Sequence, residues 1–299
     1  MNKHDKYIIN KIICKAKSCD EIVNKLNGKY DEDDLLDELL NKYNKRTIVA
    51  SVPLFSKKEN LDKIADYFIS KNATIYLARL LYINSFISCI SKDKLEKLVD
   101  LCFDYYYNDS SVIIYLYNKN LIDEEYIINK LAKSKERRIS FVKMLVHYNY
   151  VNSNIVNESY IQNVALESLD AKLIYDYASK SNSFDVKKLE EKLISTNNSH
   201  YIYLFAKDII GADIAKLTDK IFELGDSYYM LHAVADIDAS LINRFKTAEE
   251  ILYAISSLDD MSESFKISLI NKIVSGLNQN KRYEDDKKLN ESKIKLAQK

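Results

Sequence analysis

Glycine and proline are almost absent from this chain, which has 4 glycines and one proline, Pro53, among 299 residues. Sandwiches, barrels and doubly wound sheets use both residue types in turns and phosphate-binding loops. A chain of this length without them therefore favours an all-α fold. Hydrophobic residues make up 47% of the sequence and charged residues 29%, which is typical of a globular protein with a substantial core.

Local signals mark many helix starts. In a capping box, the side chain of a Ser or Thr accepts a hydrogen bond from the backbone N–H three residues on. A Glu at that later position accepts in turn from the backbone N–H of the Ser or Thr. Such boxes begin at Ser18, Ser56 and Thr247. Further expected N-caps are Asp31, Ser91, Asp123 and Ser262. Between these starts the apolar residues recur at helical spacing, as in Leu61, Ile64, Ala65 and Phe68.

The segment 47–55, TIVASVPLF, departs from this pattern. It is rich in β-branched residues and contains Pro53, which disfavours helical geometry in the residue before it. We expect a connector between an N-terminal helical piece and the main array here, with extended geometry before Pro53; a lone strand is the less favoured alternative. The predicted organisation is an N-terminal helical region with this connector over residues 1–55, a repeat array over 56–276, and a charged tail over 277–299 that is a frayed helix or disordered.

A repeat of 28 residues is visible around Tyr201–Asp226, YIYLFAKDIIGADIAKLTDKIFELGD. Residues that match at this shift are Ala178 and Ala206, Asp185 and Asp213, Leu189 and Leu217, Tyr175 and Tyr203, Tyr201 and Tyr229, and Asp208 and Asp236. In one unit we expect Gly211 to close the first helix and Asp213 to cap the second. The expected buried stripe of that second helix is Ile214, Leu217, Ile221 and Leu224. One such hairpin cannot bury its own apolar face, so it must stack on its neighbours.

These residues resemble the degenerate helical tandem repeats of low-GC bacteria and their phages, which share a core like Y-I-Y-x-F-A-x-D-I-x-G-A-[DN]-I-x-x-L. The match is good over 201–226 and partial over 173–198 and 229–245, so the clearest units lie in 173–245. The resemblance implies an α-solenoid of stacked short helical hairpins, similar in size to HEAT or ankyrin arrays, and it implies no activity. The region before the array is expected to be irregular and helical.

Two groups of residues are candidates for binding a partner. The consecutive Tyr105, Tyr106 and Tyr107 point about 100° apart on a helix, so one stripe cannot bury all three. They form either an aromatic contact surface or inter-helix packing with hydroxyls at the rim. The basic cluster Lys130, Lys133, Lys135, Arg137 and Arg138 contacts either phosphates or an acidic partner, or is a solvated face at a helix end.

Motifs for catalysis, metal binding or cofactor binding are absent from the sequence. Asp31–Asp34 does not have the spacing of an EF-hand loop and is better explained as a negative first helical turn. His147 and His232 lie in apolar helical settings, where a histidine is usually packed. We expect no enzyme activity, no catalytic residues, no metal and no cofactor. Cys14, Cys19, Cys89 and Cys102 form no C-x-x-C pair and are expected to be free, buried thiols in a reducing cytoplasm.

The charge balance limits the class of partner. Lys+Arg and Asp+Glu both number 44, so the chain as a whole is not attracted to nucleic acid or to an anionic membrane. We expect a cytoplasmic, non-enzymatic scaffold that binds another protein, with no membrane contact. The composition and the resemblance to phage repeats suggest a host protein as this partner, such as a defence protein that the scaffold inhibits. The alternative is a helical-repeat protein that binds nucleic acid through Lys and Tyr along its groove.

Overall fold

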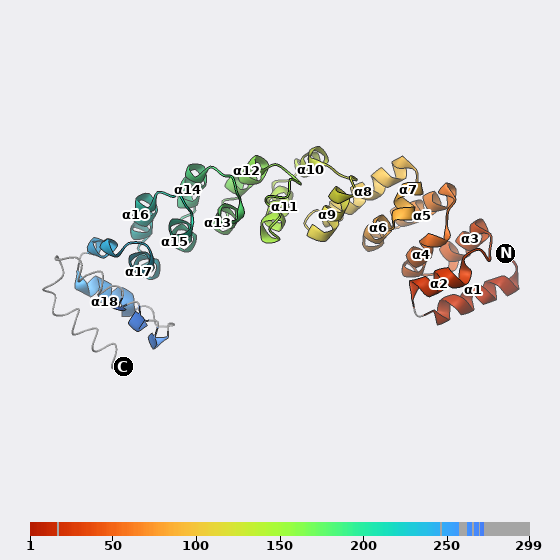
Figure 1. Ribbon diagram of the computed structural model, residues 1–299, viewed down its shortest axis with the longest axis horizontal. Coiled ribbons are helices and arrows are strands. Elements are labelled where there is room, and N and C mark those ends of the chain that lie inside the picture. The colour runs from red at the N-terminus through yellow and green to blue at the C-terminus, as the bar shows by residue number, and fades with distance from the viewer. Residues whose placement is uncertain (17, 246, 257–261, 265, 269, 272–299) are drawn as a thin grey trace. The chain divides into compact units, whose positions relative to one another are not determined.

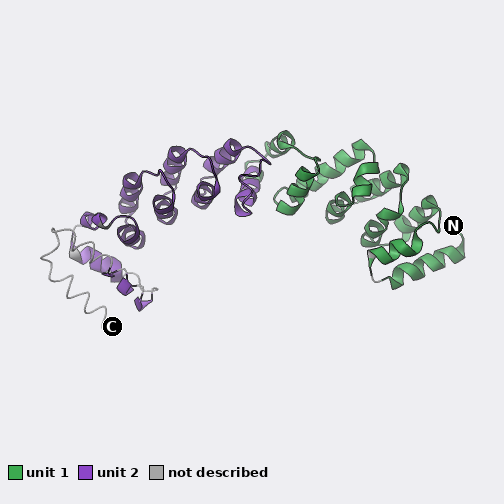
Figure 2. Ribbon diagram, in the orientation of Figure 1, with its two compact units in different colours: residues 1–137 green, residues 138–299 purple. Residues whose placement is uncertain are grey.

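The computed structural model describes residues 1–299 except 17, 246, 257–261, 265, 269 and 272–299. The described residues form helices joined by short turns, with no strand among them, so the predicted all-α class is confirmed. They separate into two compact units, residues 1–137 and 138–299 (Figure 2). The predicted tail, 277–299, lies outside the described residues.

The first unit contains ten α-helices and one short 3-10 helix among its described residues, and the unit boundary falls inside α11 (Lys135–His147). Its elements are α1 (Lys3–Lys15), α2 (Cys19–Leu26), α3 (Glu32–Lys42), α4 (Lys45–Ser51), η1 (Val52–Leu54), α5 (Lys58–Ser70), α6 (Thr74–Leu81), α7 (Asn84–Cys89), α8 (Lys92–Tyr106), α9 (Ser110–Asn118) and α10 (Glu124–Leu131). The predicted stripe of α5 is buried throughout. Helices two positions apart pack together, as α2 with α4, α3 with α5, and α4 with α6.

The second unit repeats this packing more regularly. Its elements are α12 (Glu158–Ser168), α13 (Ala171–Lys180), α14 (Val186–Ser195), α15 (Ser199–Asp208), α16 (Ile214–Leu224), α17 (Ser227–Asp236), η2 (Ala239–Arg244) and α18 (Ala248–Ser256). Helices α13, α15 and α17 pack in one row, and α14 packs against α16 in the other (Figure 1). Within this unit, consecutive hairpins therefore stack on each other. An α-solenoid running through the whole chain stays a prediction.

The extended geometry expected before Pro53 is wrong, and 47–55 contains no strand. Most of it is helical, in α4 and η1, and Val52 is right-handed helical although Pro53 follows it. Asn44 caps α4 by accepting from the Thr47 backbone N–H at 3.0 Å. Ile48 and Val52 are fully buried, so tertiary packing outweighs the local preference of the residue before proline.

Helix ends rely on asparagine where most chains use glycine. Asn72, Asn120, Asn149 and Asn197 each follow a helix with φ between 44° and 62°. Asparagine tolerates this left-handed region better than other residues with a β-carbon. Gly225 ends α16 in the same way, whereas Gly211 lies two residues beyond the extended C-cap of α15 and does not close that helix.

For the second helix of the repeated hairpin, α16, the predicted cap is confirmed and the predicted buried stripe is confirmed in part. Asp213 caps α16 by accepting from the Lys216 N–H at 3.1 Å. Leu217 and Ile221 are fully buried, whereas Leu224 is half-buried and Ile214, the first residue of the helix, is 47% exposed, so the predicted stripe is buried only at its centre.

One polar contact recurs where hairpins stack, and we call it the junction clamp. A side-chain oxygen of the fifth residue of a helix accepts from the backbone N–H of the N-cap residue of a later helix. The acceptor and donor pairs are Asp62 with Ser91 (2.8 Å), Gln162 with Asp185 (2.8 Å) and Glu190 with Asp213 (2.7 Å). The clamp satisfies a backbone donor at a helix start and fixes one hairpin against the next.

Candidate functional site

The predicted basic cluster is divided by its ion pairs. Lys130 Nζ lies 2.9 Å from an Asp100 oxygen and 3.8 Å from an Asp104 oxygen. A guanidinium nitrogen of Arg137 lies 2.9 Å from the other oxygen of Asp104. Aspartates on α8 therefore neutralise these two cations, and the arrangement gives no bare positive patch for phosphate.

The other three basic residues are placed differently. Arg138 pairs with Glu167 of α12 at 3.2 Å, within the second unit. Lys133 and Lys135 are exposed. The structure thus brings Lys130 and Arg137 together around Asp104 and directs Arg138 to a separate partner.

The consecutive tyrosines lie at the end of α8. Tyr105 is 56% exposed, whereas Tyr106 and Tyr107 are half-buried. The guanidinium of Arg137 lies 5.1 Å from the centroid of the Tyr107 ring, a cation–π contact. Tyr105 and Tyr106 contact each other edge to face at 4.7 Å. Two of the three rings are thus engaged in packing, and only Tyr105 presents most of its surface.

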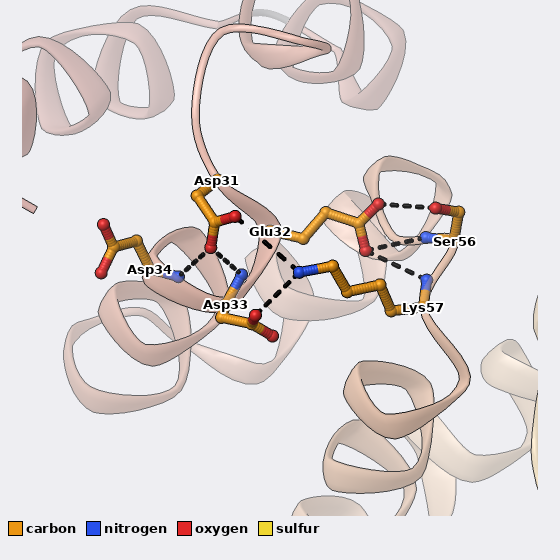
Figure 3. Close-up of polar contacts among 6 residues, drawn as sticks. All are labelled: Asp31, Glu32, Asp33, Asp34, Ser56 and Lys57. Atoms are coloured by element: carbon orange, nitrogen blue, oxygen red, sulfur yellow. Dashed lines mark hydrogen bonds and ion pairs between the residues drawn. The ribbon is translucent and has the colours of Figure 1, made fainter.

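The acidic segment at the start of α3 is occupied by structural contacts (Figure 3). Asp31 accepts from the backbone N–H groups of Asp33 and Asp34, so it is the N-cap that the sequence predicts. Asp33 pairs with Lys57 at 2.8 Å. Asp34 pairs with the N-terminal amine of Met1 at 3.0 Å. These partners leave little free charge for a cation.

At the start of α5, hydrogen bonds to Glu32 of α3 take the place of the capping box predicted at Ser56. The Glu32 carboxylate accepts from the Ser56 N–H (3.0 Å), the Ser56 hydroxyl (2.6 Å) and the Lys57 N–H (3.1 Å), as Figure 3 shows. Ser56 was expected to cap α5 through its own hydroxyl, and this is wrong because the hydroxyl donates to Glu32 and Lys57 is the N-cap residue. Burial raises the pKa of Glu32, but these hydrogen bonds outweigh it and hold the pKa below its ordinary value.

A continuous row of aromatic rings crosses α13, α15 and α17 in the second unit. Its ring contacts, with centroid separations of 4.5–5.9 Å, join Tyr175, Tyr201, His200, Tyr229, Tyr203, His232 and Tyr228. We call this set the aromatic row. Most of its members are half-buried: they pack against the helices and still present ring surface to solvent.

Hydrogen bonds hold the tyrosines of the aromatic row in place. The Tyr175 hydroxyl donates to Asp208 at 2.7 Å, and the Tyr203 hydroxyl donates to Asp236 at 2.8 Å. Both donors and both acceptors are related by the 28-residue shift seen in the sequence. The Tyr229 hydroxyl is bonded to His200. Sequence reasoning found these matching positions but did not connect them as a surface.

The electrostatics of the aromatic row differ from those of a phosphate-binding groove. Burial and the hydrogen bond to Asp208 raise the pKa of Tyr175 to about 12, so this hydroxyl stays protonated at neutral pH. Asp208 and Asp236 lie at the row together with Lys207, whose Nζ is 3.3 Å from the Tyr203 hydroxyl, while the nearby Lys172 is paired with Asp176. Carboxylates in these positions repel a phosphate backbone.

The two histidines singled out in the sequence have different settings. His232 is 13% exposed and bonds to Asp236 at 3.1 Å, so its predicted packing is correct. His147 is exposed at the end of α11 and contacts Tyr148, so the prediction of packing is wrong there.

Other kinds of site are not formed by the part of the chain that the structure describes. No three His, Cys, Asp or Glu side chains come together there as metal ligands. No described helix has the length and apolar character needed to cross a membrane. Cys14, Cys89 and Cys102 are free thiols; Cys102 is buried as expected, but Cys14 and Cys89 are exposed, so the expected burial is wrong for these two.

Comparison of the chain with protein-family models, with curated proteins and with solved structures gives no match.

Proposed function

We propose that this chain is a non-enzymatic scaffold that binds another protein through the aromatic row. The observation that carries the proposal is the unbroken set of ring contacts over three neighbouring helices. Tyrosine is enriched at the centre of protein interfaces because it offers a large surface at a low cost in conformational entropy. The sequence resemblance to phage repeats makes a host protein the partner to test first.

The hydrogen bonds of the row support this proposal. Tyr175 is held by Asp208, so its ring loses little further freedom when a partner covers it. Tyr203, which is only 6% exposed and is held by Asp236, packs against the rings of Tyr229 and His232. The same aspartates weigh against the alternative of nucleic-acid binding, since their charge opposes the phosphate contacts that dominate affinity. Lys207, whose Nζ lies 5.5 Å from the centroid of the Tyr203 ring, is a cation at the row that favours the alternative.

The test is capture of a partner by variants of the full chain. Tyr201→Ala combined with Tyr229→Ala removes ring surface from the middle of the row, while Tyr253→Ala removes a ring that is 73% exposed on α18, outside the row. We expect the double variant to weaken binding by about 30-fold or more, as for two hot-spot residues, and the control to change it little. Equal binding by the unmodified chain, the double variant and the Tyr253→Ala control would refute the assignment of binding to the aromatic row. Binding that falls steeply with salt and is competed by RNA or DNA would favour the alternative.

A further inference from the structure

One junction in the first unit lacks its clamp. Glu96 is the fifth residue of α8, the place of Asp62 in α5 and Glu190 in α14. The matching donor is the backbone N–H of Asp123, the N-cap of α10. Among the hydrogen bonds of the described residues, none joins Glu96 to this N–H; the carboxylate instead lies 3.8 Å from Lys92 in an exposed pair.

A pocket of about 660 Å³ occupies the unclamped junction. Both Glu96 and Asp123 line it, together with residues of α9 and of the turn after it. Its volume falls within the range of small-ligand sites. Val99 and Ile122, which are 4% and 5% exposed, supply an apolar floor.

The charge of the lining favours a cation. Three carboxylates, Glu96, Asp100 and Asp123, face one ammonium, Lys92. Asp100 is already held by Lys130 and by the Tyr126 hydroxyl at 2.6 Å. Glu96 is 66% exposed and its pair with Lys92 is long, so it is the carboxylate most available to a new partner.

Two aromatic rings complete the pocket. Tyr117 and Tyr126 both line it. The Tyr126 ring is fixed by its bond to Asp100 and by an edge-to-face contact with Phe103 at 5.4 Å, and Lys130 Nζ already lies 5.7 Å from its centroid, so the Tyr117 ring is the one offered to a new cation. Tyrosine faces attract cations, and the planar guanidinium group stacks on them better than an ammonium does.

We propose that this pocket binds one arginine side chain presented by a protein partner, with its guanidinium at Glu96 and its methylene stem on the apolar floor. The site lies in the first unit, apart from the aromatic row, and rests on the proposed function only in that the arginine belongs to a protein. Lysine fits less well because it lacks the planar group that a tyrosine ring recognises.

The test uses the full chain and small probes, so it does not depend on the identity of the partner. N-acetyl-arginine amide carries the guanidinium as its only charge, and N-acetyl-citrulline amide is its neutral counterpart of the same shape. We expect the arginine probe to shift the backbone amide NMR signals of residues 120–123 with a Kd on the order of 1 mM, as for a ligand of this size. The citrulline probe should bind at least about tenfold more weakly, since it loses the charge that the pocket complements.

Variants of α8 supply a matched control. Glu96→Gln should weaken the arginine probe about threefold to tenfold, whereas Asp93→Asn removes an exposed carboxylate of the same helix outside the pocket and should leave its Kd unchanged. The proposal is overturned if the probe gives no shifts up to about 20 mM, if citrulline or N-acetyl-lysine amide binds as well as arginine, or if Glu96→Gln has no effect. Failure here leaves the capture test of the aromatic row untouched, and the reverse also holds.

Discussion

The junction clamp of Glu190 gives a sharp test of how the hairpins of the second unit are held together. Glu190 is 3% exposed and accepts from the Asp213 backbone N–H at 2.7 Å, and its other oxygen lies 3.2 Å from Lys216. The equivalent residue one hairpin earlier is Gln162, which makes the same backbone contact at 2.8 Å. The geometry therefore needs an oxygen acceptor at this position and does not need a charge.

Two substitutions separate these contributions. Glu190→Ala leaves a partly buried N–H without its acceptor and removes buried methylene groups, which together should destabilise the chain by about 2–4 kcal/mol. Glu190→Gln keeps the acceptor and loses only the ion pair to the 41% exposed Lys216, so it should cost about 1 kcal/mol or less. Glu191→Ala, on the exposed neighbour that lies 3.9 Å from Lys216, is the matched control and should cost less than about 0.5 kcal/mol.

The assay has a global and a local readout. Thermal unfolding followed by circular dichroism should show Tm lowered by roughly 5–15 °C for Glu190→Ala and by a few degrees at most for the other two variants. Hydrogen exchange of the Asp213 amide should accelerate in the alanine variant and remain slow in the glutamine variant. If Glu190→Gln is as destabilising as Glu190→Ala, the charge matters and the clamp argument is wrong. If Glu190→Ala is no worse than Glu191→Ala, the contact contributes nothing to stacking.

Three further measurements test other parts of the fold. Leu169 ends α12 in the left-handed region, at φ 57°, with 56% of its surface exposed. Leu169→Asn should therefore raise the free energy of unfolding by about 0.5–1 kcal/mol in a urea titration; a lower free energy of unfolding would show that the leucine side chain contributes packing that asparagine cannot replace. A double-mutant cycle of Tyr203→Phe with Asp236→Asn should give a coupling of about 1 kcal/mol, and additive effects would argue that the hydrogen bond does not fix the ring. Burial raises the pKa of Cys102 to about 12, whereas Cys89 is exposed. Iodoacetamide at neutral pH should therefore modify Cys89 and spare Cys102 in the folded chain, as measured by peptide mass mapping. Rapid labelling of both thiols would contradict the packing of α8.

Helix starts were the most predictable part of the fold, because their signals are local. Asp31, Asp123 and Asp213 each accept from a backbone N–H two or three residues on, as the sequence indicates. Ser91 occupies an N-cap position but gives its hydroxyl to Asp62. The difference arises from a carboxylate 29 residues away, which no local motif reveals.

Helix ends and the candidate surfaces were harder to predict. With only 4 glycines, the left-handed turns fall mainly on asparagine, a residue that is also common at N-caps, so composition gives no clear signal for them. The basic cluster looked like a patch in sequence because Asp100 and Asp104, which pair with Lys130 and Arg137, lie on an earlier helix. The aromatic row was detectable in principle, since its tyrosines and aspartates obey the 28-residue shift, but only the fold shows that they lie side by side.

The polar contacts between hairpins also indicate where binding residues should be sought. At clamped junctions a backbone N–H occupies the side-chain acceptor, so Asp62, Gln162 and Glu190 stabilise stacking and are poor candidates for binding. A carboxylate at the same helical position without that partner, as at Glu96, keeps its capacity for an external donor. A repeat that leaves this acceptor unused at one junction can thus gain a binding site while its neighbours keep the stack intact, because each hairpin depends mainly on contacts with the next one. Differences between equivalent positions are for this reason more informative about function than the positions that match.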